Sequence, residues 1–199
     1  MAEEHEGAAK VVVGVDGSNH SRAALEWAAA EAGRRGVELR IVHALGMPLV
    51  VSAYGPTRFR PTDEISEQAT DVLKSAADRA RELNPSVSVE TVTAMEEAPL
   101  ALLRQSRRND LIVLGSRGLG TVAAMFVGSV SIRVAAQAPC PVVVVPSDDE
   151  GRPATTKMDR VVVGVDGSRN ARRALGLATD LASENNGELV VVNSWDVPY

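Results

Sequence analysis

The chain has 199 residues, of which 45% are hydrophobic but only 3% aromatic, so its core must be built from aliphatic side chains. Its formal net charge of -5 argues against a protein that coats nucleic acid or an anionic membrane, because both need clustered Lys and Arg. The single cysteine, Cys140, excludes an internal disulfide, and no apolar stretch approaches the roughly 20 residues that span a bilayer.

Strand and helix patterns alternate from residue 10 to residue 146. Residues 1–9 are polar and predicted to be disordered. They lack the apolar core of a signal peptide, so a cytoplasmic location is expected. The stretch 46–62 contains three prolines and no periodicity, which predicts a long surface loop that covers the ligand. The predicted elements are, in chain order, a strand at 11–15, a helix at 20–35, a strand at 38–45, the loop at 46–62, a helix at 63–83, a strand at 87–92, a helix at 98–107, a strand at 111–115, a helix at 128–137 and a strand at 142–145.

This alternation predicts an α/β fold. Strands separated by helices pair in parallel through right-handed crossovers, and an aliphatic composition suits a sheet that is covered on both faces. We therefore predict a doubly wound, five-stranded parallel sheet in the order 3-2-1-4-5.

The chain then repeats itself. Residues 160–168 match residues 10–18 at a constant offset of 150, and the register continues to Pro198, the counterpart of Pro48. Residues 147–158 between the copies are predicted to be a linker. The second copy, 160–199, holds only a βαβ unit, which buries too little apolar surface to be stable alone. We expect a truncated tandem protein; the alternative is a natural short form whose fragment docks on the first domain or on another chain.

A glycine-rich loop follows the strand at 111–114. It contains Gly115, Gly118 and Gly120, and Gly128-Ser129 then opens a helix. Glycines let another group approach their amides closely, and the first turn of a helix presents N–H groups without intrahelical partners. Because the loop lies at the carboxyl end of a parallel strand, a phosphorylated ligand is predicted to bind there.

The spacing Gly115-x2-Gly118-x9-Gly128-Ser129 resembles the nucleotide-binding signature of the ATP-binding branch of the universal stress protein family. The opening Val11-Val12-Val13-Gly14-Val15-Asp16-Gly17-Ser18 is similar to the first strand and turn of that family. The resemblance implies a Rossmann-like domain, similar to the adenine nucleotide alpha hydrolases, over residues 10–146. It also implies that residues 160–199 begin a second, tandem domain.

The resemblance further implies a role for each matching position. Gly115 and Gly118 would contact the ribose and phosphates, and the phosphates would also rest on Gly128 and Ser129. Asp16 would contact the adenosine side, and the main chain of Val42 the adenine edge.

Each position also has a structural interpretation. Asp16 can simply end a strand, the glycines can close tight turns, and the Val42 side chain can belong to the core. Arg117, between two glycines, either pairs with a phosphate or is solvated. His43 has no second ligand at metal spacing, so no metal site is predicted from protein side chains.

Other phosphate motifs fit less well. No Gly-Lys-(Ser/Thr) follows the glycines, so the P-loop pattern fails. Gly118-x-Gly120-x-x-Ala123 satisfies a loose dinucleotide fingerprint, but it follows the fourth strand instead of the first. It also lacks the later acidic residue that ribose recognition needs.

The sequence therefore predicts an ATP-binding universal stress protein, a regulatory nucleotide sensor in stress response or dormancy, with Mg²⁺ or Mn²⁺ beside the nucleotide. Nothing supplies a good base for activating water, so at most slow hydrolysis or autophosphorylation is expected. A homodimer through the fifth strand, 142–145, is implied by the resemblance. Two alternatives stay open: an interaction module of the same fold without nucleotide, dimerising through that strand, and a small ATP-dependent phosphotransferase.

Overall fold

The computed structural model describes residues 8–46, 49–52, 55–58, 61–116, 128–148, 150, 152 and 158–194. The chain divides into two compact units, Met1–Ala154 and Thr155–Tyr199, and each is described by itself. Among the described residues, no helix combines the length and the apolar character that a membrane span requires.

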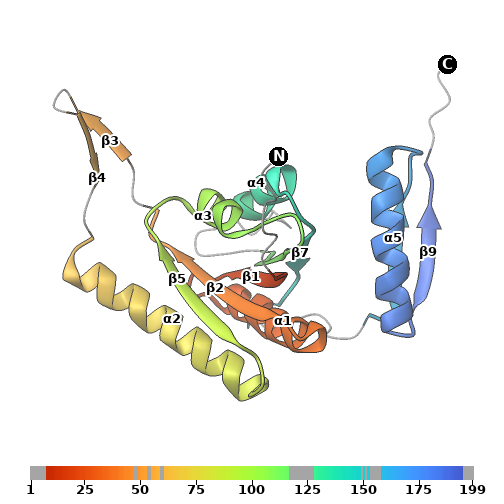
Figure 1. Ribbon diagram of the computed structural model, residues 1–199, viewed down its shortest axis with the longest axis horizontal. Helices are drawn as coiled ribbons and strands as arrows, with labels where there is room; N and C mark the ends of the chain where they lie inside the picture. The colour runs from red at the N-terminus through yellow and green to blue at the C-terminus, as the bar shows by residue number, and fades with distance from the viewer. Residues whose placement is uncertain are drawn as a thin grey trace. The chain divides into compact units, whose positions relative to one another are not determined.

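The first unit is built on one five-stranded parallel sheet (Figure 1). Its strand order, β5-β2-β1-β6-β7, corresponds to 3-2-1-4-5 and confirms the predicted fold. The strands are β1 (Lys10–Gly14), β2 (Glu38–Ala44), β5 (Val89–Ala94), β6 (Leu111–Gly115) and β7 (Val142–Val145).

In the described part of this unit, helices cover both faces of the sheet. They are α1 (Asn19–Arg35), α2 (Asp63–Leu83), α3 (Ala98–Gln105) and α4 (Ser129–Gln137). In Figure 1, α1 and α2 lie below the sheet, and α3 and α4 lie above it. Ser18 begins α1, because its side chain accepts a hydrogen bond from the Ser21 amide at 3.1 Å, and Gly36 ends it with a left-handed φ of 65°.

The core follows the two central strands. Val11, Val12 and Val13 of β1 are all fully buried, which explains why this strand is a continuous β-branched run without alternation. The largest fully buried side chains are Leu39, Ile41, Leu102, Ile112, Val11, Val12, Val13, Val113 and Val134.

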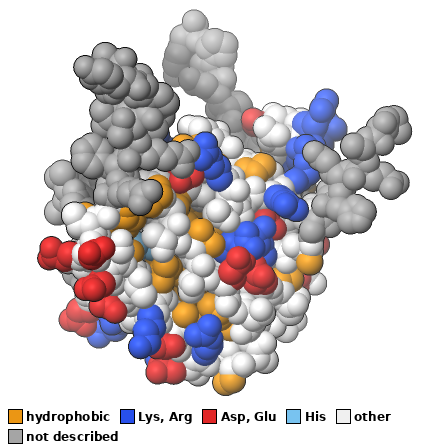
Figure 2. All heavy atoms as spheres, turned by 60° about the vertical axis from the view of Figure 1, so that its left-hand side comes forward, with side chains coloured by type: hydrophobic (Ala, Val, Ile, Leu, Met, Phe, Trp, Pro, Cys, Tyr) orange, Lys and Arg blue, Asp and Glu red, His pale blue; other side chains and the backbone are white. Residues whose placement is uncertain are grey.

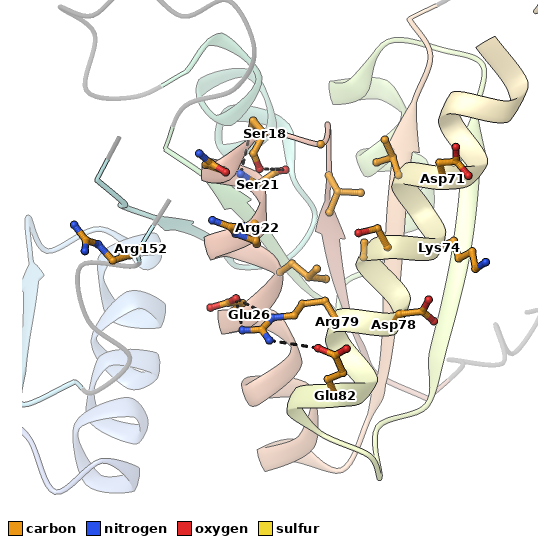
Figure 3. A pocket seen from close by; sticks show the side chains of 17 residues that line it. Ser18, Ser21, Arg22, Glu26, Asp71, Lys74, Asp78, Arg79, Glu82 and Arg152 are labelled. Atoms are coloured by element: carbon orange, nitrogen blue, oxygen red, sulfur yellow. Dashed lines mark hydrogen bonds and ion pairs between the residues drawn. The ribbon is translucent and has the colours of Figure 1, made fainter. Parts of the chain in front are cut away.

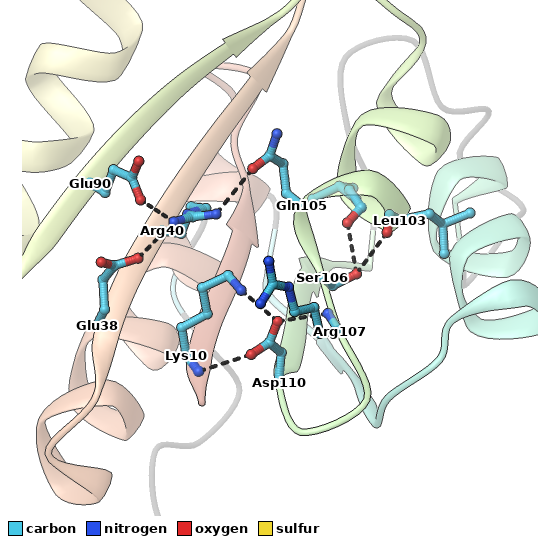
Figure 4. A network of polar contacts seen from close by, with 10 residues as sticks. Lys10, Glu38, Arg40, Glu90, Leu103, Gln105, Ser106, Arg107 and Asp110 are labelled. Carbon is cyan, nitrogen blue, oxygen red and sulfur yellow. Dashed lines mark hydrogen bonds and ion pairs between the residues drawn. The ribbon is translucent and has the colours of Figure 1, made fainter. Parts of the chain in front are cut away.

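A buried ion pair closes the amino edge of the sheet (Figure 4). Lys10 Nζ lies 2.7 Å from Asp110 Oδ2, with the two side chains 10% and 2% exposed. The Asp110 carboxylate also accepts hydrogen bonds from the main-chain amides of Lys10, at 3.0 Å, and Arg107, at 2.7 Å. These contacts fix the start of β1 against the approach to β6.

Cys140 lies close to this ion pair and is half-buried. Burial raises the pKa of its thiol, and the negative charge of Asp110 raises the pKa further. The thiol therefore stays protonated at neutral pH, as expected for a cysteine that packs instead of reacting.

The predicted long loop at 46–62 was wrong in part. The structure contains a short antiparallel hairpin there, formed by β3 (Leu49–Ser52) and β4 (Gly55–Arg58). Each strand has only four residues, and β4 begins Gly55-Pro56, two residues that are rare inside strands, so no periodicity was visible. Whether this segment covers a ligand stays a prediction.

The second unit repeats the first three elements of the first. It consists of β8 (Arg160–Gly164), α5 (Arg169–Glu184) and β9 (Glu188–Val192), with the two strands parallel. All three begin at the offset of 150 from β1, α1 and β2, whereas α5 ends one residue and β9 two residues earlier than their counterparts. The exposure differs, however: Val162 is 61% exposed, whereas its counterpart Val12 is fully buried. That this unit begins a second domain remains a prediction.

Candidate functional site

The carboxyl edge of the sheet brings two of the predicted site residues to neighbouring strands. β1 pairs with β6 in parallel, so Asp16, which follows β1, and Gly115, which ends β6, reach the same edge. Asp16 is held in a tight turn: its Oδ1 accepts the Ser18 amide at 3.0 Å, and its own amide donates to Ser21 Oγ at 3.3 Å. These two hydrogen bonds fix the Asp16 carboxylate in the turn that connects β1 to α1.

The start of α4 is attached directly to the end of β6. The Gly128 amide donates to the Ser116 carbonyl at 2.7 Å, and Ser131 Oγ donates to the Gly115 carbonyl at 3.0 Å. The N-cap residue Gly128 supplies no side-chain hydrogen bond to the first turn of α4, and Ser129 is exposed. Among the described residues, no side chain caps the first amides of α4, and this helix start is joined to the end of β6, which is a suitable arrangement for an anion.

Arg117 and Gly118, the other two predicted residues of the glycine loop, lie outside the described residues. Their roles stay predictions from the sequence.

The main chain of Val42 is already used within the sheet. Its carbonyl accepts the Val15 amide at 2.9 Å, and its side chain is only 2% exposed. Residues of β2 with even numbers face β1, as this bond indicates, and residues with odd numbers face β5, as the bond from the Leu45 amide to the Ala94 carbonyl indicates. Ala44 is therefore the next residue of β2 whose main chain faces the β1 side of the carboxyl edge.

His43 also lies at the carboxyl edge of the sheet, although the sequence alone did not assign it to the site. Its Nδ1 lies 2.8 Å from the Val15 carbonyl oxygen. A carbonyl only accepts hydrogen bonds, so Nδ1 carries the proton and donates it. The sequence contains no signal for this contact, because an isolated histidine reveals neither its partner nor its tautomer.

The chain beyond β7 returns to the start of α1. His20 Nδ1 lies 2.6 Å from Ser147 Oγ, and Arg22 donates to the Glu150 carbonyl at 3.1 Å. The first part of the predicted linker, 147–158, is thus attached to the first unit next to the Asp16 turn.

A separate groove of about 1070 Å³ lies between α1 and α2 (Figure 3). Arg79 spans it, with Nη2 2.8 Å from Glu26 Oε1, and this hydrogen bond raises the pKa of Arg79. Acidic and basic side chains are equally represented along the groove, so it carries no excess positive charge to select a phosphate. The charged side chains are Arg22, Lys74, Arg79, Arg152, Glu26, Asp71, Asp78 and Glu82.

Charged side chains form no single-sign patch on the face that Figure 2 shows. On the face shown in Figure 2, basic and acidic side chains are interspersed. Within the described part of the chain, no group of three or more His, Cys, Asp or Glu side chains is arranged to hold a metal ion.

Comparison with known proteins gives one consistent result. The model of the universal stress protein family matches residues 8–146 and 157–199. A universal stress protein of Mycobacterium tuberculosis is 36% identical over 93% of this chain and 62% of its own length. One of Mycolicibacterium smegmatis is 32% identical over 94% of this chain and 66% of its own length. The chain thus spans a little less than two thirds of these curated relatives.

Solved structures agree. A universal stress protein from Archaeoglobus fulgidus is 26% identical, with a TM-score of 0.56 over 69% of this chain and 98% of that chain. A universal stress protein in complex with cAMP is 27% identical, with a TM-score of 0.54 over 70% of this chain and 98% of that chain. The family model covers most of this chain, and the parallel sheet has the same fold as these structures; the chain belongs to the universal stress protein family.

Proposed function

We propose that this chain binds ATP at the carboxyl edge of the first unit and acts as a regulatory nucleotide sensor in stress response or dormancy. The observation that carries the proposal is the start of α4: its N-cap residue, Gly128, has no side chain to cap the first amides, and Ser131 Oγ of its first turn donates to the Gly115 carbonyl. A helix start of this kind favours phosphate through its open N–H groups and its dipole.

The comparisons support an adenine nucleotide as the ligand. A related structure of 27% identity contains cAMP, which has the adenosine part of ATP and a phosphate. In our proposal the triphosphate rests on Gly115, Gly118, Gly128 and Ser129, with Arg117 as a further contact. Asp16 lies on the adenosine side. Because the Val42 carbonyl is taken by Val15, we assign the adenine edge to the main chain of Ala44 instead.

The residues of this edge fit a nucleotide better than a resident metal. Among the described residues, no three or more His, Cys, Asp or Glu side chains are arranged to hold a metal ion, so any Mg²⁺ or Mn²⁺ would be held mainly by phosphate oxygens and water. This chain would then supply amide donors and the Ser129 hydroxyl, which orient the phosphates and exclude part of their water.

Isothermal titration with ATP and Mg²⁺ tests the proposal directly, and Gly128→Ala is the sharpest variant. Gly128 has φ -70° and ψ 154°, which alanine adopts without strain, so a loss of affinity would report a blocked approach of the phosphate. We expect ATP affinity to fall at least about tenfold, equivalent to about 1.4 kcal/mol.

Gly36→Ala is the matched control. Gly36 ends α1 with a φ of 65° and has open space around it, so alanine there lowers stability through backbone strain but leaves the ATP dissociation constant unchanged. A wild-type chain that binds no ATP, or a Gly128→Ala chain that binds it as tightly as wild type, contradicts the proposal.

We also propose that two copies of the chain associate through β7. This strand ends the sheet, and its Val142, Val143 and Val144 remain half-buried in a single copy. An apolar edge strand of this kind is a template for pairing with a second copy.

A further inference from the structure

The end of β1 contains an unusual hydrogen bond. In a parallel ladder, the strand residue that donates to one neighbouring carbonyl accepts from the amide two positions further along the neighbour. Val15 donates to Val42 at 2.9 Å, so a regular ladder would pair its carbonyl with the Ala44 amide. Instead, the His43 side chain donates to that carbonyl at 2.8 Å.

The second unit reproduces this bond with a different side chain. The Val165 amide donates to the Val192 carbonyl at 2.8 Å, and Asn193 Nδ2 donates to the Val165 carbonyl at 2.7 Å. Asn193 is the counterpart of His43 at the offset of 150. In both side chains the donating nitrogen is bonded to Cγ, so the two residues place an N–H at the same point. Both units therefore place a side-chain donor at this carbonyl, and histidine is only one way to supply it.

The adjacent turn is also reproduced in both units. Ser18 donates its amide to Asp16 at 3.0 Å, and Ser168 donates its amide to Asp166 at 2.9 Å. The side-chain donor to the end of the first strand thus belongs to a complete local arrangement that both copies share, which argues against an accidental contact of His43.

We propose that His43 is a positioning residue that keeps the main chain of Ala44 open to the purine base. This inference rests on the proposed ATP site and defines its base preference. The His43 side chain takes the place of the Ala44 amide at the Val15 carbonyl: among the described residues, no ladder hydrogen bond joins the Ala44 amide to that carbonyl, although the amide faces the β1 side of β2. An amide beside a carbonyl offers one donor and one acceptor to a base edge.

That pair of groups distinguishes adenine from guanine. Adenine presents an acceptor at N1 beside a donor at its N6 amino group, which matches the amide and carbonyl of Ala44. Guanine presents a donor at N1 and an acceptor at O6, which is the reverse pattern. The open Ala44 main chain therefore selects ATP over GTP, and His43 is needed for that selection although it does not touch the base.

The test compares ATP and GTP affinities of the full chain by titration calorimetry with Mg²⁺. In His43→Leu the Ala44 amide returns to the Val15 carbonyl and one base hydrogen bond is lost. We expect the ATP affinity to fall about tenfold while the GTP affinity stays constant. The ratio of ATP affinity to GTP affinity therefore also falls about tenfold. His43→Asn copies the second unit and should keep the wild-type preference.

Asn193→Leu is the matched control, because it removes the same hydrogen bond from the second unit and should leave both affinities unchanged. If His43→Leu does not fold, His43→Gln replaces it, since its amide nitrogen lies one bond further from the backbone. The inference is overturned if His43→Leu or His43→Gln keeps the full preference for ATP over GTP. It is also overturned if His43→Asn loses as much of this preference as His43→Leu.

Hydrogen exchange of the Ala44 amide provides a readout that needs no nucleotide. The amide should exchange quickly in wild type and His43→Asn, and become protected in His43→Leu or His43→Gln. If wild type binds neither ATP nor GTP, the proposed ATP site is wrong. The exchange rates of the Ala44 amide then still test the positioning role of His43, and equal rates in all variants refute that role.

Discussion

At the scale of single residues, Glu31 is a nearly buried charged group of the first unit. Its side chain is 8% exposed and contacts two arginines, with Arg34 Nε at 2.8 Å and Arg35 Nε at 2.6 Å. Burial alone would raise the pKa of this carboxyl, but the hydrogen bonds from Arg34 and Arg35 outweigh it and lower the pKa below 4.5.

The lowered pKa of Glu31 predicts an acid-dependent loss of stability. A carboxyl whose pKa is lower in the folded state stabilises the fold above its unfolded pKa, and this contribution disappears as the pH falls through the folded pKa. We expect Glu31→Gln to be less stable than wild type by about 1–2 kcal/mol at pH 7, with the difference shrinking below pH 4.5. Urea unfolding of both proteins at neutral and acidic pH measures this. A difference that does not change with pH would contradict the assignment.

Single residues also mark the limit of the sequence prediction for the site. The sequence placed Asp16, Gly115 and Gly128 at one edge because glycine spacing is a local pattern and the alternation of strands and helices predicts which strands are neighbours. It assigned the base edge to Val42, whose carbonyl accepts from Val15, and it gave His43 no role. Both features depend on which neighbouring strand each main-chain group faces, and this follows from the register between β1 and β2, which local patterns do not contain.

At the scale of elements, β7 offers a defined way to test assembly. The carbonyls of Pro141 and Val145 accept from β6, so odd-numbered residues of β7 face the sheet and the amide of Val144 faces outward. Val144→Pro removes this outward donor without breaking the bonds to β6. In a symmetric pair each copy loses one edge hydrogen bond, which predicts a dimer weakened about hundredfold.

Sedimentation measures the association, and Val144→Thr is the control because it keeps the amide and the strand preference. We expect wild type and Val144→Thr to dimerise and Val144→Pro to be largely monomeric at the same concentration. A wild-type monomer at every concentration, or a Val144→Pro dimer of unchanged strength, excludes pairing along β7.

Most elements could be placed from local patterns, and the exceptions have physical causes. The helix at 63–83 and the strands at 111–115 and 142–145 have the predicted bounds, since caps, prolines or polar residues mark both ends. The strand predicted at 87–92 lies at Val89–Ala94, because a β-branched run does not show where pairing begins. The β3–β4 hairpin was missed because four-residue strands are too short to display a period.

At the scale of the whole molecule, the two units contain the same elements but bury them differently. Val162, Val191 and Val192 of the second unit are 61%, 51% and 46% exposed. Their counterparts in the first unit, Val12, Ile41 and Val42, are at most 2% exposed. The first unit buries these positions because β5, β6 and the helices above the sheet cover them. In the described part of the second unit, β8 and β9 pair only with each other.

This difference predicts unequal local stability, which the repeat makes measurable within one chain. Strand amides exchange through local opening, and opening costs less where fewer apolar contacts are broken. We expect the amides of Val161–Val163 to exchange at least about hundredfold faster than those of Val11–Val13, a difference of about 2.7 kcal/mol. Native-state hydrogen exchange of the full chain, measured by mass spectrometry on matched peptides, compares β1 with β8. The comparison is direct because two nearly identical sequences have similar intrinsic exchange rates. Equal protection of β1 and β8 would mean that the exposed valines are covered in solution, and the second unit would then have to be regarded as part of a larger packed structure.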